Sequence, residues 1–205
     1  MARAERGRPR VILIGGTSHA GKSSLAGALA RRLGYEALST DQLARHPGRP
    51  WRRGEAPVPP HVVEHYSTLP PEALIADVMR HYEAMWPMVR ELVERRLADA
   101  EAPGLVLEGS ALLPSLAGRI GGGRVAAVWL VADETVLEAR MRRESRFEAA
   151  DAAGRALIEA FLERTRRYQR SMVAAVDALG LMRLTVRPAE SIEAVADHVT
   201  ALLGL

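Results

Sequence analysis

The sequence predicts an α/β fold in which a five-stranded parallel sheet is covered by helices on both faces. Short apolar runs recur along the 205 residues, amphipathic segments separate them, and each run stops at turn residues or a helix-start signal. Continuous rather than alternating hydrophobicity is typical of strands that are buried on both faces. The alternation of strands with helices indicates a parallel sheet. The length suits one domain.

Five strands are expected from the apolar runs. They span residues 11–14, 36–39, 105–107, 125–131 and 181–186. The first strand ends in a pair of glycines, and the second and third end beside Asp41 and Glu108. Polar residues at these points are candidates for a site at one edge of the sheet.

Five amphipathic helices are expected as well. They span residues 23–33, 71 to about 100, 134–146, 154 or 155 to about 179, and 189–203. Gly34 is a natural C-terminal cap for the first, and Asp133 can cap the N-terminus of the third. Pro87 lies inside the second helix, where proline removes a backbone hydrogen bond, so we expect a kink there. Residues 46–60, rich in proline and arginine, are expected to be irregular.

Composition and charge exclude several classes of protein. The chain has no cysteine, so disulfides and thiolate metal sites are excluded, and nothing suggests an oxidising compartment. The apolar runs are far shorter than the ~20 residues of a membrane span, and the N-terminal run is too short for a signal-peptide core. The net charge is only +3, and the sparse aromatic residues are not interleaved with the basic ones. We therefore expect a cytoplasmic enzyme or switch with no membrane or nucleic-acid partner.

The first strand leads into a phosphate-binding loop. Residues 16–23 follow the pattern Gly-x-x-x-x-Gly-Lys-Ser between a buried strand and a helix. Glycines let backbone N–H groups turn inward around an anion, and the helix N-terminus adds partial positive charge. A glycine-rich turn that merely joins a strand to a helix is the alternative. The expected phosphate-binding residues are Gly16, Thr17, Ser18, His19, Ala20, Gly21, Lys22, Ser23 and Ser24.

Within this loop, Lys22 and Ser23 are expected to have specific roles. Lys22 would reach the β- and γ-phosphates, and the Ser23 hydroxyl would ligate Mg²⁺. Lys22 is the single lysine among 28 basic residues, at a position where a slim ammonium fits between two phosphates better than a planar guanidinium. ATP is favoured over GTP, because a chain with no other lysine cannot contain the Asn-Lys-x-Asp segment of Ras-type guanine readers. His19 is expected to be a spacer.

Two carboxylates follow neighbouring strands of the predicted sheet. Asp41 ends the second strand and Glu108 the third, and ligands of open parallel sheets collect beyond the carboxyl ends of the strands. A carboxylate there can accept a proton from an attacking hydroxyl, or hold Mg²⁺ directly or through water. Asp41 is therefore a candidate catalytic base, and Glu108 a candidate catalytic and metal-binding residue. The alternatives are a helix cap for Asp41 and a turn residue for Glu108.

Arginines gather after the fourth strand. Arg140, Arg143 and Arg146 are spaced three apart on one helix face, where they could neutralise the charge of a transferring phosphoryl group. A solvated face balanced by Glu144 and Glu148 is the alternative. The arginine-rich stretch at residues 45–53 could bind an anionic substrate with Trp51 as an apolar wall, or be only a loop. A second row is expected at the surface: Arg164, Arg166, Arg167 and Arg170.

Several segments together resemble small P-loop kinases. Residues 11–24, Val-Ile-Leu-Ile-Gly-Gly-Thr-Ser-His-Ala-Gly-Lys-Ser-Ser, resemble the start of the 2-phosphoglycerate kinase family and of chloramphenicol phosphotransferase. Residues 38–41, Leu-Ser-Thr-Asp, look like the strand end where that family places an aspartate to meet the substrate hydroxyl. Residues 106–114, Val-Leu-Glu-Gly-Ser-Ala-Leu-Leu-Pro, are similar to the Val-Ile-Glu-Gly-Val-His-Leu-Val-Pro segment of 2-phosphoglycerate kinases. The resemblance covers most of the chain from residue 10 to about 186.

The resemblance implies a P-loop NTPase three-layer sandwich of the nucleoside-monophosphate-kinase type, with strand order 2-3-1-4-5 and a helical lid. It also implies transfer of the γ-phosphate of ATP to the hydroxyl of a small molecule. Ala111 stands where the family has a histidine, and Ser110 replaces an apolar residue. Both departures point to a changed substrate pocket.

The first hypothesis is therefore an ATP-dependent small-molecule kinase, a single domain over residues 1–205 with an acceptor-binding insertion at 42–103 and a lid at 140–155. Its cofactors would be ATP and Mg²⁺, and its partner a small-molecule hydroxyl acceptor. One alternative is an antibiotic or nucleotide phosphotransferase on the same core, and another is a non-catalytic ATP-binding regulatory protein. Asp41 and the arginine row favour the enzyme, because a pure switch needs neither. The expected catalytic residues are Lys22, Asp41, Glu108, Arg140 and Arg143.

Overall fold

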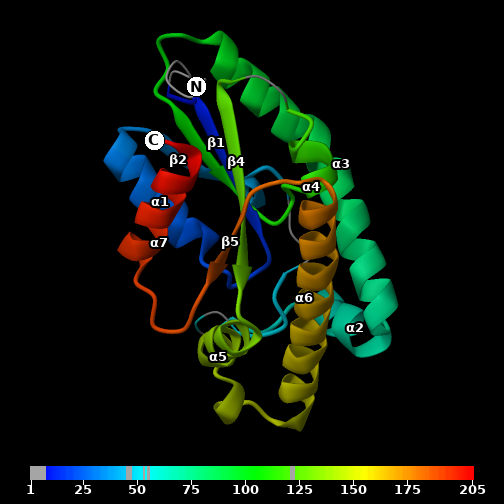
Figure 1. The fold of residues 1–205 in the computed structure, drawn as a ribbon. Coiled ribbons are helices and arrows are strands. Elements are labelled where there is room, and N and C mark those ends of the chain that lie inside the picture. The colour runs from blue at the N-terminus through cyan, green and yellow to red at the C-terminus, as the bar shows by residue number, and fades with distance from the viewer. Residues whose placement is uncertain (1–7, 45–47, 53, 55, 121–122) are drawn as a thin grey trace.

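The fold is a five-stranded parallel sheet in the order β2-β3-β1-β4-β5, with helices on both faces (Figure 1). The structure is a computed structural model that describes residues 8–44, 48–52, 54, 56–120 and 123–205. All four strand pairings are parallel. The strands are β1 (Val11–Gly16), β2 (Glu36–Ser39), β3 (Leu105–Glu108), β4 (Val125–Ala132) and β5 (Arg183–Val186). The predicted fold class and strand order are confirmed.

Seven α-helices lie between and after the strands in the described part of the chain. They are α1 (Lys22–Leu33), α2 (Pro60–Thr68), α3 (Pro71–Ala98), α4 (Pro114–Ala117), α5 (Glu134–Ser145), α6 (Ala152–Ala178) and α7 (Ile192–Leu203). Two 3-10 helices add to them, η1 (Thr40–Gln42) and η2 (Phe147–Ala149). No helix of the described ranges is both long enough and apolar enough to cross a membrane.

The hydrophobic core forms two layers, one on each face of the sheet. On β1, Ile12 and Ile14 contribute to the layer under α1 and α7. Val11 and Leu13 contribute to the opposite layer, under α3 and α6 (Figure 1). Side chains that alternate along a strand point to opposite faces. Both faces of β1 are covered, which is why its sequence is apolar without interruption.

Local signals set several helix ends. Gly34 has φ 68° and caps α1 in the left-handed conformation, as predicted, because glycine adopts this conformation without steric cost. The Asp133 carboxylate accepts a hydrogen bond from the backbone N–H of Thr135 and caps α5, also as predicted. Arg146 adopts φ 52° and ends α5 one residue earlier than expected. Pro87 lies inside α3, which runs past it to Ala98.

The largest departures from the prediction lie before α3 and near the C-terminus. Helix α2 was not predicted; Pro60 begins it, and its buried Val62 and Tyr66 lie one turn apart. The last strand begins at Arg183, two residues later than expected. The last helix begins at Ile192 rather than at residue 189, because the Ser191 hydroxyl accepts a hydrogen bond from the Ala194 N–H and caps it there.

Candidate functional site

A cavity of about 1400 Å³ opens at the carboxyl ends of the strands. Most of the residues predicted for the site line it, namely Ser18, His19, Ala20, Gly21, Lys22, Ser23, Ser24, Asp41, Glu108, Arg140 and Arg143. Gly16 and Thr17 are buried directly beneath, in the first part of the loop. The Thr17 hydroxyl donates to the backbone carbonyl of Thr165 on α6, at 3.4 Å. The topology thus brings segments from distant parts of the sequence to one side of the sheet.

The loop at residues 16–23 requires backbone conformations that few residues adopt. Gly16 and Gly21 have φ angles of 140° and 101°, and His19 has φ 65°. A Cβ atom on Gly16 would lie 2.7 Å from the carbonyl oxygen of Leu130, so only glycine fits there. Gly21 is the N-cap of α1, and no side chain of the described residues caps that helix. The N-terminus of α1 therefore has no capping side chain, and an uncapped helix N-terminus is suited to binding an anion.

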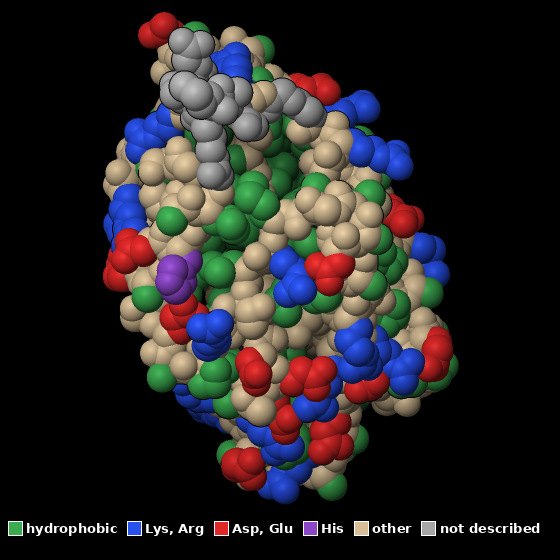
Figure 2. All heavy atoms as spheres, in the orientation of Figure 1, with side chains coloured by type: hydrophobic (Ala, Val, Ile, Leu, Met, Phe, Trp, Pro, Cys, Tyr) green, Lys and Arg blue, Asp and Glu red, His purple; other side chains and the backbone are tan. Residues whose placement is uncertain are grey.

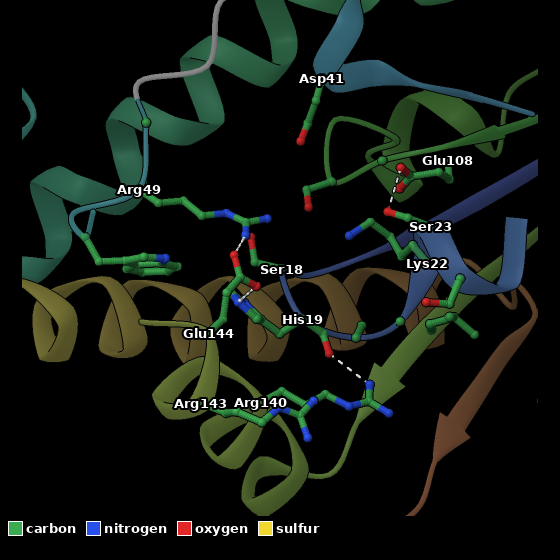
Figure 3. A pocket seen from close by; sticks show the side chains of 18 of the residues that line it. Ser18, His19, Lys22, Ser23, Asp41, Arg49, Glu108, Arg140, Arg143 and Glu144 are labelled. Atoms are coloured by element: carbon green, nitrogen blue, oxygen red, sulfur yellow. Dashed lines mark hydrogen bonds and ion pairs between the residues drawn. The ribbon is translucent and has the colours of Figure 1, made fainter. Parts of the chain in front are cut away.

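Lys22 folds back over this loop. Its ammonium is buried and donates a hydrogen bond of 2.8 Å to the carbonyl oxygen of Thr17. Burial lowers the pKa of Lys22, while the carboxylates of Glu108 and Asp41 oppose that shift. In Figure 3 the ammonium points into the cavity between Asp41 and the loop. The side chain thus reaches the space that the phosphates of a nucleotide would enter.

Ser23, at the start of α1, and Glu108, at the end of β3, form a pair in the cavity. The Ser23 hydroxyl donates a hydrogen bond of 2.9 Å to the Glu108 carboxylate, which is only 6% exposed. Glu108 ends β3 opposite Ile14 of β1 and Ser39 of β2. No cluster of three or more His, Cys, Asp or Glu side chains suited to a metal occurs among the described residues. The pair fits Mg²⁺, which usually takes one or two protein ligands and completes its shell with water and phosphate oxygens.

Asp41 points into the cavity from the turn after β2 (Figure 3). The alternative that it caps a helix is wrong, because the Ser39 hydroxyl accepts the hydrogen bond at the N-terminus of η1, from the N–H of Asp41 itself. Gly109 allows this turn to approach β3, since a Cβ atom there would lie 1.8 Å from the hydroxyl of Thr40. The carboxylate is therefore free of a capping role.

The arginines of α5 separate into two groups. Arg140 donates a hydrogen bond of 3.0 Å to the backbone carbonyl of His19, and Arg143 lines the cavity. Burial, followed by the nearby charge of Arg143, lowers the pKa of Arg140. Arg142 instead pairs with Glu138 and Glu148. Within the predicted row, Arg143 is exposed whereas Arg140 is half-buried, so the solvated alternative does not describe Arg140. Figure 2 shows acidic and basic side chains mingled over the lower end of the molecule.

Three positions were interpreted wrongly or incompletely. Arg146 leaves the predicted helical row, because it adopts the left-handed conformation after α5. Arg164 is buried rather than at the surface; its guanidinium donates to the Tyr66 hydroxyl at 2.6 Å and lies over the ring of Phe161. Of the stretch at 45–53, residues 45–47 and 53 lie outside the described residues.

The described part of that stretch faces the cavity. Arg49 and Trp51 both line it, and Trp51 is 6% exposed. The ring of Trp51 packs edge to face against Phe161, with centroids 5.0 Å apart. Trp51 is therefore an apolar wall, as one of the two interpretations expected. The indole Nε1 is buried and has no hydrogen-bond partner among the described residues.

His19 is more than a spacer. Its side chain is 5% exposed, and Nε2 lies 2.9 Å from the Glu144 carboxylate on α5. The guanidinium of Arg49 bonds the other oxygen of the same carboxylate (Figure 3). Burial and the positive charge of Arg49 lower the pKa of His19 to about 4, against the opposing effect of Glu144. Spacing along the chain gave no sign of this cluster, because its members are up to 125 residues apart.

The lowered pKa of His19 predicts a pH-dependent stability. Between pH 6.5 and pH 4 the unfolded chain binds a proton at this histidine that the folded chain does not. The free energy of unfolding therefore falls as the pH is lowered through this window, by up to about 3 kcal/mol. Urea unfolding at pH 7 and pH 4.5 measures the free energy of unfolding of wild type and of His19→Asn. The difference between the two proteins, in favour of wild type, should be smaller at pH 4.5. A difference in unfolding free energy that is the same at both pH values would contradict the prediction. His61→Asn, at an exposed histidine, is the control.

The part of the cavity near β5 was not predicted from the sequence. Leu130, Val186, Ile192 and Val195 contribute apolar surface there, together with Glu190. Since β5 and β2 are at opposite edges of the sheet, this surface lies across the loop from Asp41. No motif marks these positions, because they are ordinary apolar residues at the ends of β4 and β5 and in α7.

Comparisons with solved structures find a similar fold in several kinases that act on small molecules. A gluconokinase from Sinorhizobium meliloti 1021 matches with 21% identity, a TM-score of 0.53 and coverage of 97% of this chain and 94% of its own. A sugar kinase from Janibacter sp. HTCC2649 matches with 19% identity, TM-score 0.53 and coverage of 96% and 95%. A shikimate kinase from Bacteroides thetaiotaomicron matches with 16% identity, TM-score 0.53 and coverage of 95% and 98%.

The chain thus shares its α/β fold with these kinases over nearly its whole length. Neither a family model nor a curated protein matches it. At these identities the likeness is one of fold, and function must be argued from the site.

Proposed function

We propose that this protein is an ATP-dependent kinase that transfers the γ-phosphate of MgATP to a hydroxyl of a small molecule. The observation that carries the proposal is that Lys22, the Ser23–Glu108 pair and Asp41 line one cavity. These groups come from the ends of three adjacent strands, β1, β3 and β2. A phosphate-binding loop alone would serve any nucleotide-binding protein, whereas a carboxylate facing the same space suits an acceptor hydroxyl.

The chemistry follows from these positions. The loop amides and Lys22 would hold the β- and γ-phosphates, and the apolar surface near β5 would accept the base. Asp41 would take the proton of the acceptor hydroxyl as its oxygen bonds to the γ-phosphorus and the bond from that phosphorus to ADP breaks. Arg140 and Arg143 would stabilise charge on the transferring group. Ser23 and Glu108 would hold Mg²⁺, directly or through water, and the ion would neutralise phosphate charge.

Two regions would complete the enzyme. Residues 42–103 would form the side of the cavity that binds the acceptor, with Arg49 and Trp51 in its wall. Residues 140–155, which include the second half of α5, would form the lid. The resemblance at residues 106–114 supports an acceptor similar to 2-phosphoglycerate, with Ser110 and Ala111 altering the pocket. A cytoplasmic location fits a chain without cysteine.

A screen for an acceptor tests the proposal directly. Purified protein with MgATP should release ADP faster when hydroxylated metabolites or antibiotics are supplied, and the phosphorylated product should appear by mass spectrometry. Omission of Mg²⁺ should abolish the release. An antibiotic acceptor would support a drug-modifying phosphotransferase on the same core. Tight MgATP binding with no turnover on any acceptor would favour a regulatory ATP-binding protein instead.

A further inference from the structure

One carboxylate joins three segments of the site. Glu144, on α5, has its Oε2 atom 2.9 Å from Nε2 of His19 in the phosphate loop. Its Oε1 atom accepts a hydrogen bond from the guanidinium of Arg49, in the segment before α2. Figure 3 shows both interactions on the wall of the cavity. Glu144 thus bridges the phosphate loop and the segment at 48–52.

Helix α5 contacts both the backbone and the side chain of His19. Its backbone carbonyl accepts from Arg140 at 3.0 Å, and its ring is held by Glu144. The ring centroid lies 6.0 Å from that of Trp51 and 6.4 Å from that of Phe161. His19 also adopts φ 65°, a conformation that costs a non-glycine residue free energy. These contacts hold the loop in a conformation that the residue would not favour by itself.

The negative charge of Glu144 is expected to oppose the binding of phosphate in the cavity. Glu144 lines a cavity that, on the proposed function, takes the phosphates of ATP, and like charges at short range repel. His19, with its lowered pKa, is neutral near pH 7 and does not offset the negative charge. Arg49 does offset it, but a neutral residue in place of Glu144 would leave the Arg49 charge available to the phosphates. By charge alone, Glu144 weakens nucleotide binding.

We propose that Glu144 is a positioning residue that keeps His19 and the phosphate loop in their binding conformation and ties Arg49 and Trp51 to that loop. Binding of nucleotide would then be coupled to the conformation of the acceptor side of the cavity. A carboxylate that holds two partners by charge-assisted hydrogen bonds is suited to this task. The inference rests on the proposed function, because it assumes that MgATP binds at residues 16–23.

The direction in which nucleotide affinity changes in Glu144 variants distinguishes a positioning role from simple charge repulsion. Glu144→Ala should weaken binding of MgADP and of a non-hydrolysable MgATP analogue by about 10-fold in calorimetry, the scale of a lost hydrogen bond to a charged group. Glu144→Gln keeps the shape and one acceptor oxygen, and should weaken binding by less. Unchanged or tighter binding in both variants would overturn the proposal, because the removal of a repelling charge predicts tighter binding. Glu148→Ala, at an exposed carboxylate paired with Arg142, is the matched control.

The fluorescence of Trp51 provides a second measurement, which a general loss of structure would not reproduce. The fluorescence difference between wild type and Trp51→Phe isolates this indole from Trp86 and Trp129. We expect saturating MgADP to change the Trp51 signal in wild type and to change it far less in Glu144→Ala at equal saturation. An equal change in Trp51 fluorescence in both proteins would overturn the proposed coupling. So would the absence of any fluorescence change in wild-type protein that is saturated with MgADP. Failure of wild type to bind MgADP or MgATP at all would overturn the proposed function, and this inference with it.

Discussion

Lys22→Ala should lower the affinity for MgATP by about 100-fold and leave the fold intact. The ammonium is buried in the cavity wall and held by the Thr17 carbonyl at 2.8 Å, so a phosphate that enters can replace that carbonyl as its partner. Truncation of one member of a buried charge pair typically costs about 2–5 kcal/mol of binding free energy, and 100-fold lies within that range. Calorimetry with a non-hydrolysable analogue measures the loss. Unchanged affinity would contradict the phosphate-loop assignment.

Two further measurements make this result specific. Lys22→Met removes the charge but keeps most of the apolar stem, so it should lose affinity as Lys22→Ala does while disturbing the packing less. Because Lys22 is the only lysine in the chain, acylation of an ε-amine reports on this residue alone. Mass spectrometry should show slower acylation of Lys22 when MgATP is bound. Equal rates with and without MgATP would place the nucleotide elsewhere.

The parts of the fold that the sequence predicted are those with local causes. The strands were recognisable because each is an apolar run that ends in turn residues, and burial on both faces leaves that mark on β1 and β3. The phosphate loop was recognisable because its glycines and Lys22 are adjacent in sequence. Asp41 and Glu108 followed from a rule about strand ends, and both line the predicted cavity.

The parts that were missed depend on contacts between distant residues. Arg164 was assigned to the surface because arginines usually face water, but Tyr66, 98 residues away, provides it with a buried partner. Glu144 was considered only as a charge that balances the arginines of its own helix, since its partners come from other segments. The apolar surface near β5 carries no motif. Pairing of this kind is set by tertiary packing, which no local pattern encodes.

The structure decides between two roles for Asp41 that the sequence alone left open. The aspartate after a strand could have been a helix cap, and a cap would have occupied its carboxylate. Ser39 caps η1 instead, and the Asp41 side chain points into the cavity (Figure 3). The structural role of this turn and the chemical role proposed for the carboxylate are therefore carried by different residues, and can be tested separately.

Asp41→Asn should reduce phosphoryl transfer by about 100-fold or more while leaving MgATP affinity near that of wild type. The amide keeps the shape of the side chain but cannot accept the proton of the acceptor hydroxyl, and a lost general base typically costs ~10²–10⁴-fold in rate. Nucleotide affinity should persist, because the removal of a negative charge from the cavity does not repel phosphate. Steady-state ADP release with the acceptor found by screening gives kcat and KM, and calorimetry gives the affinity.

Ser39→Ala is the control for this experiment. It removes the hydroxyl that caps η1, which should lower stability by about 1 kcal/mol, and it leaves the Asp41 carboxylate in place. If Asp41 acts as the base, Ser39→Ala should retain most of the transfer rate while Asp41→Asn loses it. Transfer at the wild-type rate in Asp41→Asn would show that the carboxylate takes no part in the chemistry. An equal loss in both variants would mean that the turn, rather than the base, limits the reaction.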